Sequence, residues 1–145
     1  MDANRPSLPT GSLPLFVAWL LALGSTLGVL FVGEVMGQEP CLLCWYQRAF
    51  MFPLAIILGI AAARSDSTVW RYALPLAGAG WLFALYHNLL YFAVIPEEIK
   101  PCGAGPSCSS ADMTVFGALP LPSLSMAAFT LLIILLLTTR RDAYP

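Results

Sequence analysis

The chain has 145 residues, of which 59% are hydrophobic and only 10% are charged. Soluble domains carry about 25% charged residues, so this composition is incompatible with an ordinary soluble core. The net charge of −1 gives no indication of nucleic-acid binding. A chain of this length predicts one domain, which we expect to be a single integral membrane domain over residues 1–145.

Four apolar segments predict helices that cross a membrane. They cover about residues 13–33, 43–63, 72–95 and 119–139. A helix rises about 1.5 Å per residue, so about 20 residues span a hydrocarbon core of about 30 Å. The first segment is longer than the apolar part of a signal peptide and no small-residue cleavage site follows it, so we expect it to be retained. The predicted fold class is an all-α membrane protein, a bundle of four transmembrane helices.

The distribution of basic residues predicts the orientation of this bundle. Four spans put both termini on one side, together with most of the seven basic residues: Arg5, Arg64, Arg71, Arg140 and Arg141. Positive residues favour the cytoplasmic side, so both termini are expected to be cytoplasmic. The loops at about 34–42 and 96–118 then face outward. All four cysteines lie in or beside these loops, in the compartment where disulfides persist.

Cys41 and Cys44 form a C-x-x-C pair directly after Pro40, at the expected start of the second span. Proline is favoured in the first turn of a helix, so the pair is expected at a helix N-terminus. A helix N-terminus and nearby cations lower the pKa of a thiol, and the thiolate is the form that attacks disulfides. Redox chemistry is one interpretation of the pair; half of a zinc site and a plain structural disulfide are the others.

Arg48 follows Cys44 by one helical turn and lies on the same helix face. If the span began after Arg48, residues 49–63 would reach only about 22 Å, which is too short for the membrane core. Arg48 is therefore expected within the span or at its outer boundary, where a cation is costly and usually functional. We expect it to stabilise a Cys44 thiolate and to polarise an oxygen of a bound acceptor. Snorkelling to headgroup phosphates is the alternative.

His87 is the single histidine of the chain and lies in the third predicted span, about 12 Å inside its outer end. Its depth is comparable with that of Arg48. Because a polar residue within a span is costly, we favour a functional role over a purely structural one. In that role His87 hydrogen-bonds to a two-electron acceptor or exchanges a proton with it. Gln47 is expected to cap or solvate the start of its helix, and Asn88 to form a packing hydrogen bond.

Cys102 and Cys108 lie in the long outer loop. Glycine and proline residues around them make this segment turn-rich and solvent-facing. A disulfide between cysteines this close in sequence constrains few residues and adds little stability. We therefore expect an exposed disulfide that is suited to exchange, with an inert local bridge as the alternative.

The string Cys41-Leu-Leu-Cys44-Trp-Tyr-Gln-Arg48, at the mouth of the second span, resembles the signature of the DsbB/BdbC family. Tyr86-His87 in the third span and Leu-Pro-Leu-Pro122-Ser at the start of the fourth are also similar to this family. The resemblance covers essentially the whole chain, and the C-x-x-C-x-x-x-R string with this topology is fairly specific. Members are bacterial membrane proteins that regenerate a thioredoxin-like thiol oxidase and reduce quinone.

The resemblance implies an electron relay in a bacterial inner membrane, with the redox cysteines on the extracytoplasmic side. The catalytic residues would be Cys41, Cys44, Cys102 and Cys108. Cys102 should form the mixed disulfide with a DsbA/BdbD-like thiol oxidase, and Cys108 should pair with Cys102. Cys44 should meet the quinone, with Cys41 as its resolving partner. Whether Cys108 also forms a transient disulfide with Cys41 is left undecided.

Cys44, Arg48 and His87 are the residues that the resemblance implies for quinone binding, whether ubiquinone or menaquinone; no metal is implied. The Cys102–Cys108 interval is shorter than in the best-known enterobacterial members and resembles the compact BdbC-like branch. Whether an interfacial helix lies between these two cysteines is therefore left undecided. Vitamin K epoxide reductases also combine four helices with two cysteine pairs, but in the reverse order, so that family is rejected.

Two other classes of function remain as alternatives. Four cysteines could supply a closed tetrahedral zinc site, although the outer compartment and the lack of a role for Arg48 count against it. A non-enzymatic four-span scaffold would carry two inert disulfides. The favoured interpretation implies three partners: the thiol oxidase, membrane lipid and the quinone pool.

Overall fold

The computed structural model describes residues 12–96, 107–108 and 113–144. Long apolar runs with few charges form its four long helices. They are α1 (Ser12–Leu30), α2 (Leu42–Arg64), α3 (Trp70–Tyr91) and α4 (Leu121–Ala143). Short segments extend or join them: a π-helical turn η1 (Phe31–Val35), a 3-10 turn η2 (Ser67–Val69), and strands β1 (Thr114–Val115) and β2 (Leu119–Pro120).

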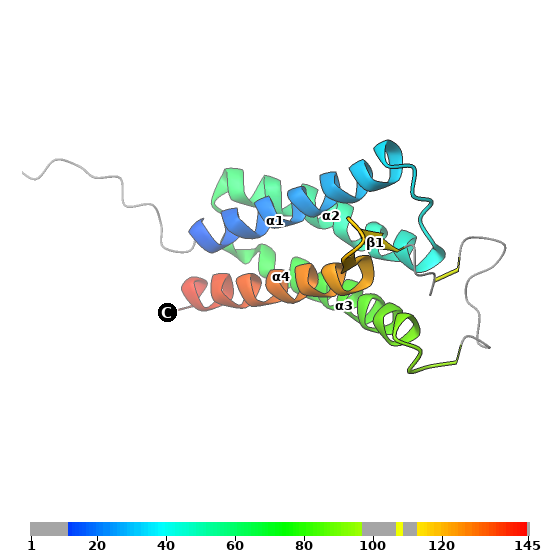
Figure 1. The fold of residues 1–145 in the computed structure, drawn as a ribbon. Coiled ribbons are helices and arrows are strands. Elements are labelled where there is room, and N and C mark those ends of the chain that lie inside the picture. Colours follow the sequence, from blue (N-terminus) through cyan, green and yellow to red (C-terminus); the bar gives the residue numbers. More distant parts are fainter. Residues whose placement is uncertain (1–11, 97–106, 109–112, 145) are drawn as a thin grey trace, which may run out of the picture.

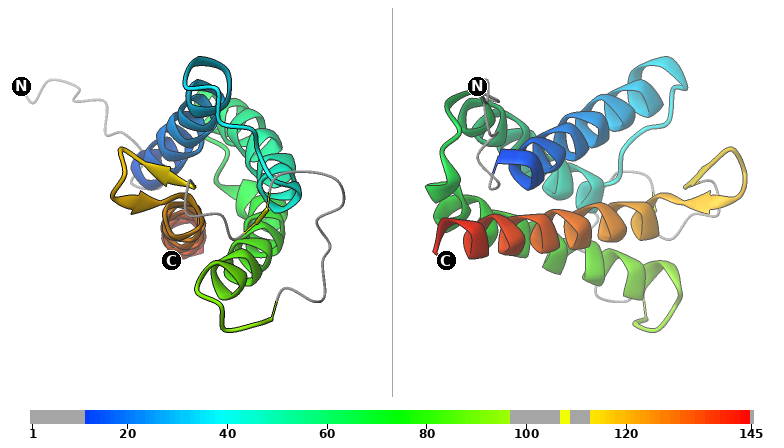
Figure 2. Two further views of the ribbon diagram at one scale, coloured as in Figure 1. Left: turned by 45° about the vertical axis from the view of Figure 1, so that its right-hand side comes forward. Right: turned by 90° about the vertical axis from the view of Figure 1, so that its left-hand side faces the viewer.

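The four helices pack side by side into one bundle (Figure 1). α1 and α3 each contact both α2 and α4. The start of α1 and the end of α4 lie at one end of the bundle (Figure 1). The other end holds the connection from η1 to α2, the end of α3 and the β1–β2 hairpin (Figure 2). The described residues are therefore mostly helical, as the sequence predicts, with two short strands in addition.

Three helical stretches among the described residues are long and apolar enough to cross a membrane: Leu13–Val35, Leu42–Arg64 and Leu121–Asp142. The chain is thus a multi-pass membrane protein. α3 is 22 residues long and carries Arg71, His87 and Asn88, and it is not among these three stretches. The count of four spans and the side on which the termini lie stay predictions.

Helix ends differ in detail from the apolar segments of the sequence. α1 continues through η1 to Val35, so helical structure extends into the region that the sequence gives as a loop. α3 ends at Tyr91, whereas the apolar segment runs to residue 95. Ala93 follows in the left-handed conformation, with φ of 55°, and this backbone conformation cannot continue a right-handed helix.

Close packing of α3 against α4 depends on Gly80. Phe129 of α4 is fully buried, and a Cβ added at Gly80 would overlap its ring. The glycine therefore lets the ring lie directly on the backbone of α3. Gly78, on the same helix, has open space at the corresponding position.

Asn88 joins the outer half of α3 to the start of α4. Its Nδ2 donates to the carbonyl oxygen of Pro122 at 2.8 Å and to that of Ala84 in its own helix at 2.8 Å. Its Oδ1 accepts from Ser123 Oγ at 2.8 Å. These bonds satisfy a buried amide, and Asn88 is the packing residue that the sequence predicts.

Replacing Gly80 with alanine should lower the free energy of unfolding by about 1–3 kcal/mol, because the added methyl group overpacks a buried ring. Gly78→Ala should be neutral or stabilising by up to about 1 kcal/mol, because alanine is the better helix former. Denaturant unfolding of the purified protein in detergent, followed by circular dichroism, measures both. Equal losses of stability would contradict the contact between Gly80 and Phe129.

Candidate functional site

The C-x-x-C pair lies at the N-terminus of α2, where the sequence predicts it. Cys41 is the N-cap residue, in an extended conformation with φ of −70° and ψ of 169°. Its Sγ accepts a hydrogen bond from the backbone N–H of Cys44 at 3.4 Å. A sulfur thus takes the capping position that side-chain oxygens usually fill. Cys41 is fully buried, whereas Cys44, one turn further, is half-buried.

The two sulfur atoms of this pair are in contact. They lie 3.1 Å apart, and both cysteines carry free thiols in this structure. A disulfide bond measures about 2.05 Å, so the sulfurs need to approach by only about 1 Å to form one. The pair is therefore reduced and close to the geometry of its oxidised form.

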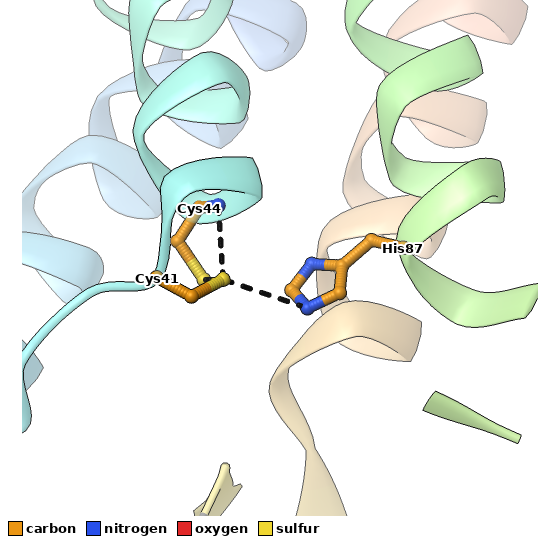
Figure 3. A group of neighbouring side chains, drawn as sticks. All are labelled: Cys41, Cys44 and His87. Atoms are coloured by element: carbon orange, nitrogen blue, oxygen red, sulfur yellow. Dashed lines mark hydrogen bonds between the residues drawn. The ribbon is translucent and has the colours of Figure 1, made fainter. Parts of the chain in front are cut away.

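His87 reaches this pair from α3 (Figure 3). Its ring is fully buried, with Nε2 at 3.8 Å from Cys41 Sγ and at 3.2 Å from the carbonyl oxygen of Cys108. Its Nδ1 lies 3.0 Å from Nε2 of Gln47. A carbonyl oxygen only accepts and an amide nitrogen only donates, so these partners select the tautomer with hydrogen on Nε2. That hydrogen is shared between the Cys41 sulfur and the Cys108 carbonyl.

Gln47 is one of the residues whose position differs from the sequence prediction. It does not solvate the start of α2: it is 7% exposed and hydrogen-bonds to His87. A polar side chain in an apolar span is costly, and the same criterion singles out Arg48 and His87 in the sequence. Applied to Gln47, which shares a helix face with Cys44, it would have found this residue as well.

Arg48 lies half-buried beside α1 rather than against a cysteine sulfur. Its Nη2 donates to the carbonyl oxygen of Val29 at 3.1 Å, and its guanidinium carbon lies 5.4 Å from the centre of the Trp45 ring. A Cβ on Gly33 would come within 3.3 Å of Nη2, so this glycine leaves room for the guanidinium beside η1. Within the described part of the chain, Arg48 makes no hydrogen bond to Cys44. Stabilisation of a Cys44 thiolate by the charge of Arg48 stays a prediction.

Cys108 is disulfide-bonded and only 5% exposed. The prediction of a solvent-facing position is wrong for this cysteine, because it packs in a buried cluster with Cys41, Leu43, Leu90 and Met113. Cys102 lies outside the described residues. An oxidised cysteine of the outer loop thus lies close to the reduced pair of α2, with His87 contacting both.

Cys41 lies just before the candidate membrane span Leu42–Arg64. Its surroundings favour the thiolate form. The side-chain hydrogen bond with Cys44 lowers the pKa of Cys41 from its ordinary 9.0 to about 4. The hydrogen bond from His87 and the backbone N–H of Cys44 act in the same direction, and burial opposes them. These contacts favour a thiolate on Cys41, whereas the sequence analysis places it on Cys44.

The same side chains could take part in a metal site. Ligand atoms of Cys41, Cys44 and His87 all lie within 4.8 Å of one another. Tetrahedral zinc, with Zn–S bonds of about 2.3 Å, holds two sulfurs about 3.8 Å apart, and the observed 3.1 Å is shorter. A site of four cysteines would also need the Cys108 thiolate, which is engaged in a disulfide.

Comparison with protein families identifies the chain. The family model described as disulfide bond formation protein DsbB matches residues 12–139. The chain belongs to this family. The resemblance carried by the Cys41–Arg48 string is thereby confirmed, and disulfide generation by an oxidoreductase follows as the general activity.

Relatives extend over nearly the whole chain. A probable disulfide formation protein of Metapseudomonas resinovorans is 58% identical over 97% of this chain and 98% of its own. One of Deinococcus radiodurans is 45% identical over 84% of this chain and 85% of its own. Disulfide bond formation protein C of Bacillus subtilis is 41% identical over 83% of this chain and 87% of its own. No solved structure matches the chain significantly.

The ultraviolet absorbance of thiolate should report the Cys41 environment of this DsbB-family protein. A lowered pKa keeps the thiolate at neutral pH and loses it only as the pH falls through the folded-state value, about 4. Cys41→Ser should lose this signal. Gln47→Leu should raise the midpoint pH of the thiolate signal, because His87 is no longer held as a donor. Gln38→Leu is the control and should not change it, because the amide of Gln38 donates to the carbonyl oxygen of Thr114 and not to His87. A wild-type midpoint near 9.0 would contradict the assignment.

Proposed function

We propose that this chain is a thiol:quinone oxidoreductase that generates disulfides de novo. A thioredoxin-like, DsbA/BdbD-like thiol oxidase delivers two electrons to Cys102/Cys108, which pass them to Cys41/Cys44 and then to a membrane quinone. The observation that carries the proposal is that disulfide-bonded Cys108 lies beside the free thiols of the inner pair. His87 hydrogen-bonds to the carbonyl of one centre and to a sulfur of the other.

Atoms and electrons balance at each proposed step. A partner thiolate attacks Cys102, and the second partner thiol resolves the mixed disulfide, so the partner is oxidised and the outer pair is reduced. The outer dithiol then reduces a Cys41–Cys44 disulfide by the same exchange. Finally the inner dithiol gives two electrons and two protons to the quinone, which leaves as quinol while the inner disulfide forms again.

Cys44 is the sulfur that we propose to meet the quinone, whether ubiquinone or menaquinone. It is half-buried whereas Cys41 is fully buried, so an acceptor that arrives from the lipid reaches Cys44 first. Cys41, as the thiolate, closes the disulfide across the 3.1 Å gap. Arg48 and His87 supply donors for the quinone oxygens. A guanidinium has five N–H donors, so the bond to Val29 leaves Arg48 able to make others.

The proposed setting is a bacterial cytoplasmic membrane, crossed four times, with both termini in the cytoplasm and the cysteines on the extracytoplasmic side. α3 would be the additional span, since it is 22 residues long and contacts both α2 and α4. Arginines cluster at the helix ends that lie away from the cysteines, on α2, α3 and α4: Arg64, Arg71, Arg140 and Arg141. This asymmetry supports the orientation.

Zinc binding is the second candidate, because three ligand atoms of Cys41, Cys44 and His87 converge. Metal analysis of anaerobically purified protein separates the two proposals. Stoichiometric zinc that is lost in Cys41→Ser would favour a metal site over the relay.

Anaerobic quinone reduction, driven by a reduced thioredoxin-like dithiol oxidase, tests the relay. The purified wild type should reduce one quinone for each partner dithiol, since each passes two electrons. Cys44→Ser and Cys102→Ser should both abolish turnover. Cys102→Ser should still oxidise its own inner dithiol once with quinone, because only the outer step is lost. Full turnover in either variant would refute the order of the relay.

Arg48→Ala in the same assay tests the quinone donor, with Arg64→Ala at the other end of α2 as the matched control. A hydrogen bond from a charged group contributes about 1.5–3 kcal/mol, so the KM for quinone should rise by about tenfold or more in Arg48→Ala. Arg64→Ala should leave it unchanged. An unaltered KM and kcat in Arg48→Ala would remove Arg48 from the quinone site.

A further inference from the structure

A basic cavity lies at the end of the bundle away from the cysteines. It has a volume of about 670 Å³ and is lined by Trp70, Arg71, Leu137, Arg140, Arg141 and Tyr144. These residues come from the start of α3, the last turns of α4 and the residue that follows α4. Among the described residues, the lining holds three arginines and no acidic side chain, so the cavity is basic.

Two of the arginines converge on one indole ring. The guanidinium carbon of Arg140 lies 4.8 Å from the centre of the Trp70 ring, and that of Arg71 lies 5.9 Å from it. Arg71 also donates to the hydroxyl of Tyr144. Like charges that share one ring repel one another, and no carboxylate among the described lining residues offsets the repulsion. An anion bound between the two guanidinium groups would offset this repulsion.

The electrostatics of the helix ends explain only part of this cluster. Arg140 and Arg141 lie in the last turn of α4, where cations are stabilised by the helix dipole. Arg71 lies in the first turn of α3, where a cation is not favoured and where no acidic residue accompanies it. Asp66, the acid that precedes this helix, is bound to Thr68 and does not line the cavity.

Trp70 adds a donor to the same wall. Its indole Nε1 is buried and has no hydrogen-bond partner among the described residues. A buried N–H that is left unpaired costs about 1–3 kcal/mol. A ligand with several acceptor oxygens, such as a phosphodiester, would satisfy the arginines and supply an acceptor for this indole after a small side-chain adjustment.

The position of the cavity at the end of a candidate span indicates where such a ligand comes from. The candidate span of α4 ends at Asp142, so Arg140 and Arg141 belong at the boundary of a hydrocarbon core that this helix crosses. Leu137, one turn inside that boundary, is 38% exposed and is available to an acyl chain. We propose that the basic cavity binds the headgroup of an anionic phospholipid, with its phosphate between Arg71 and Arg140.

Native mass spectrometry of the full-length protein in detergent, with phosphatidylglycerol or phosphatidylcholine added, tests this site. Wild type should retain one phosphatidylglycerol molecule with at least about a tenfold preference over phosphatidylcholine. The double variant Arg71→Gln/Arg140→Gln should lose the preference. Arg64→Gln removes a charge at the same end but outside the cavity, and should keep it.

Three outcomes would overturn the proposal: no preference in the wild type, an unchanged preference in the double variant, or an equal loss in Arg64→Gln. Inorganic phosphate that displaces the lipid at equal concentration would also overturn it, because the site would then be one for free phosphate. The wild-type comparison needs no variant to fold. The readout is binding, so its failure leaves the relay of the cysteines untouched.

Discussion

The buried imidazole of His87 is the contact on which the cysteine site depends. Both nitrogens of a fully buried ring need partners, and here Gln47 serves one nitrogen while Cys41 and Cys108 share the other. These partners come from α2 and from the loop that follows α3. The ring therefore sets the separation of a reduced and an oxidised cysteine, and it stabilises the thiolate that the capping position of Cys41 already favours.

The neighbouring residue on α3 extends this arrangement to α4. His87 faces α2, whereas Asn88 bonds to Pro122 and Ser123 at the start of α4. Two consecutive polar residues thus hold three helices in register at the end of the bundle that holds the cysteine pair. Arg48 connects the fourth helix, since its bond to Val29 reaches α1. Polar contacts are concentrated around the cysteines, whereas small residues and apolar side chains pack the rest of the bundle.

Much of this arrangement could be predicted from the sequence, because apolar length and the cost of buried polar groups are local properties. They predicted the helices, the pair at the start of α2 and the burial of His87. The direction in which a side chain points is not local. Arg48 turns to a carbonyl of α1, and Gln47 turns inward, because the neighbouring helices supply partners that spacing along one helix does not reveal. The burial of Cys108 likewise follows from its docking on His87.

A single-turnover reaction of the reduced inner pair with quinone, without the partner and without oxygen, addresses the central claim most directly. At each time point, alkylation and mass mapping would measure the free thiols of Cys41 and Cys44, and the amount of quinol would be measured in parallel. We expect one quinol for each Cys41–Cys44 disulfide, and a slower reaction in His87→Leu because the Cys41 thiolate loses a donor. Quinol that forms while both thiols stay open to alkylation would contradict the relay, and an unchanged rate in His87→Leu would remove the histidine from it.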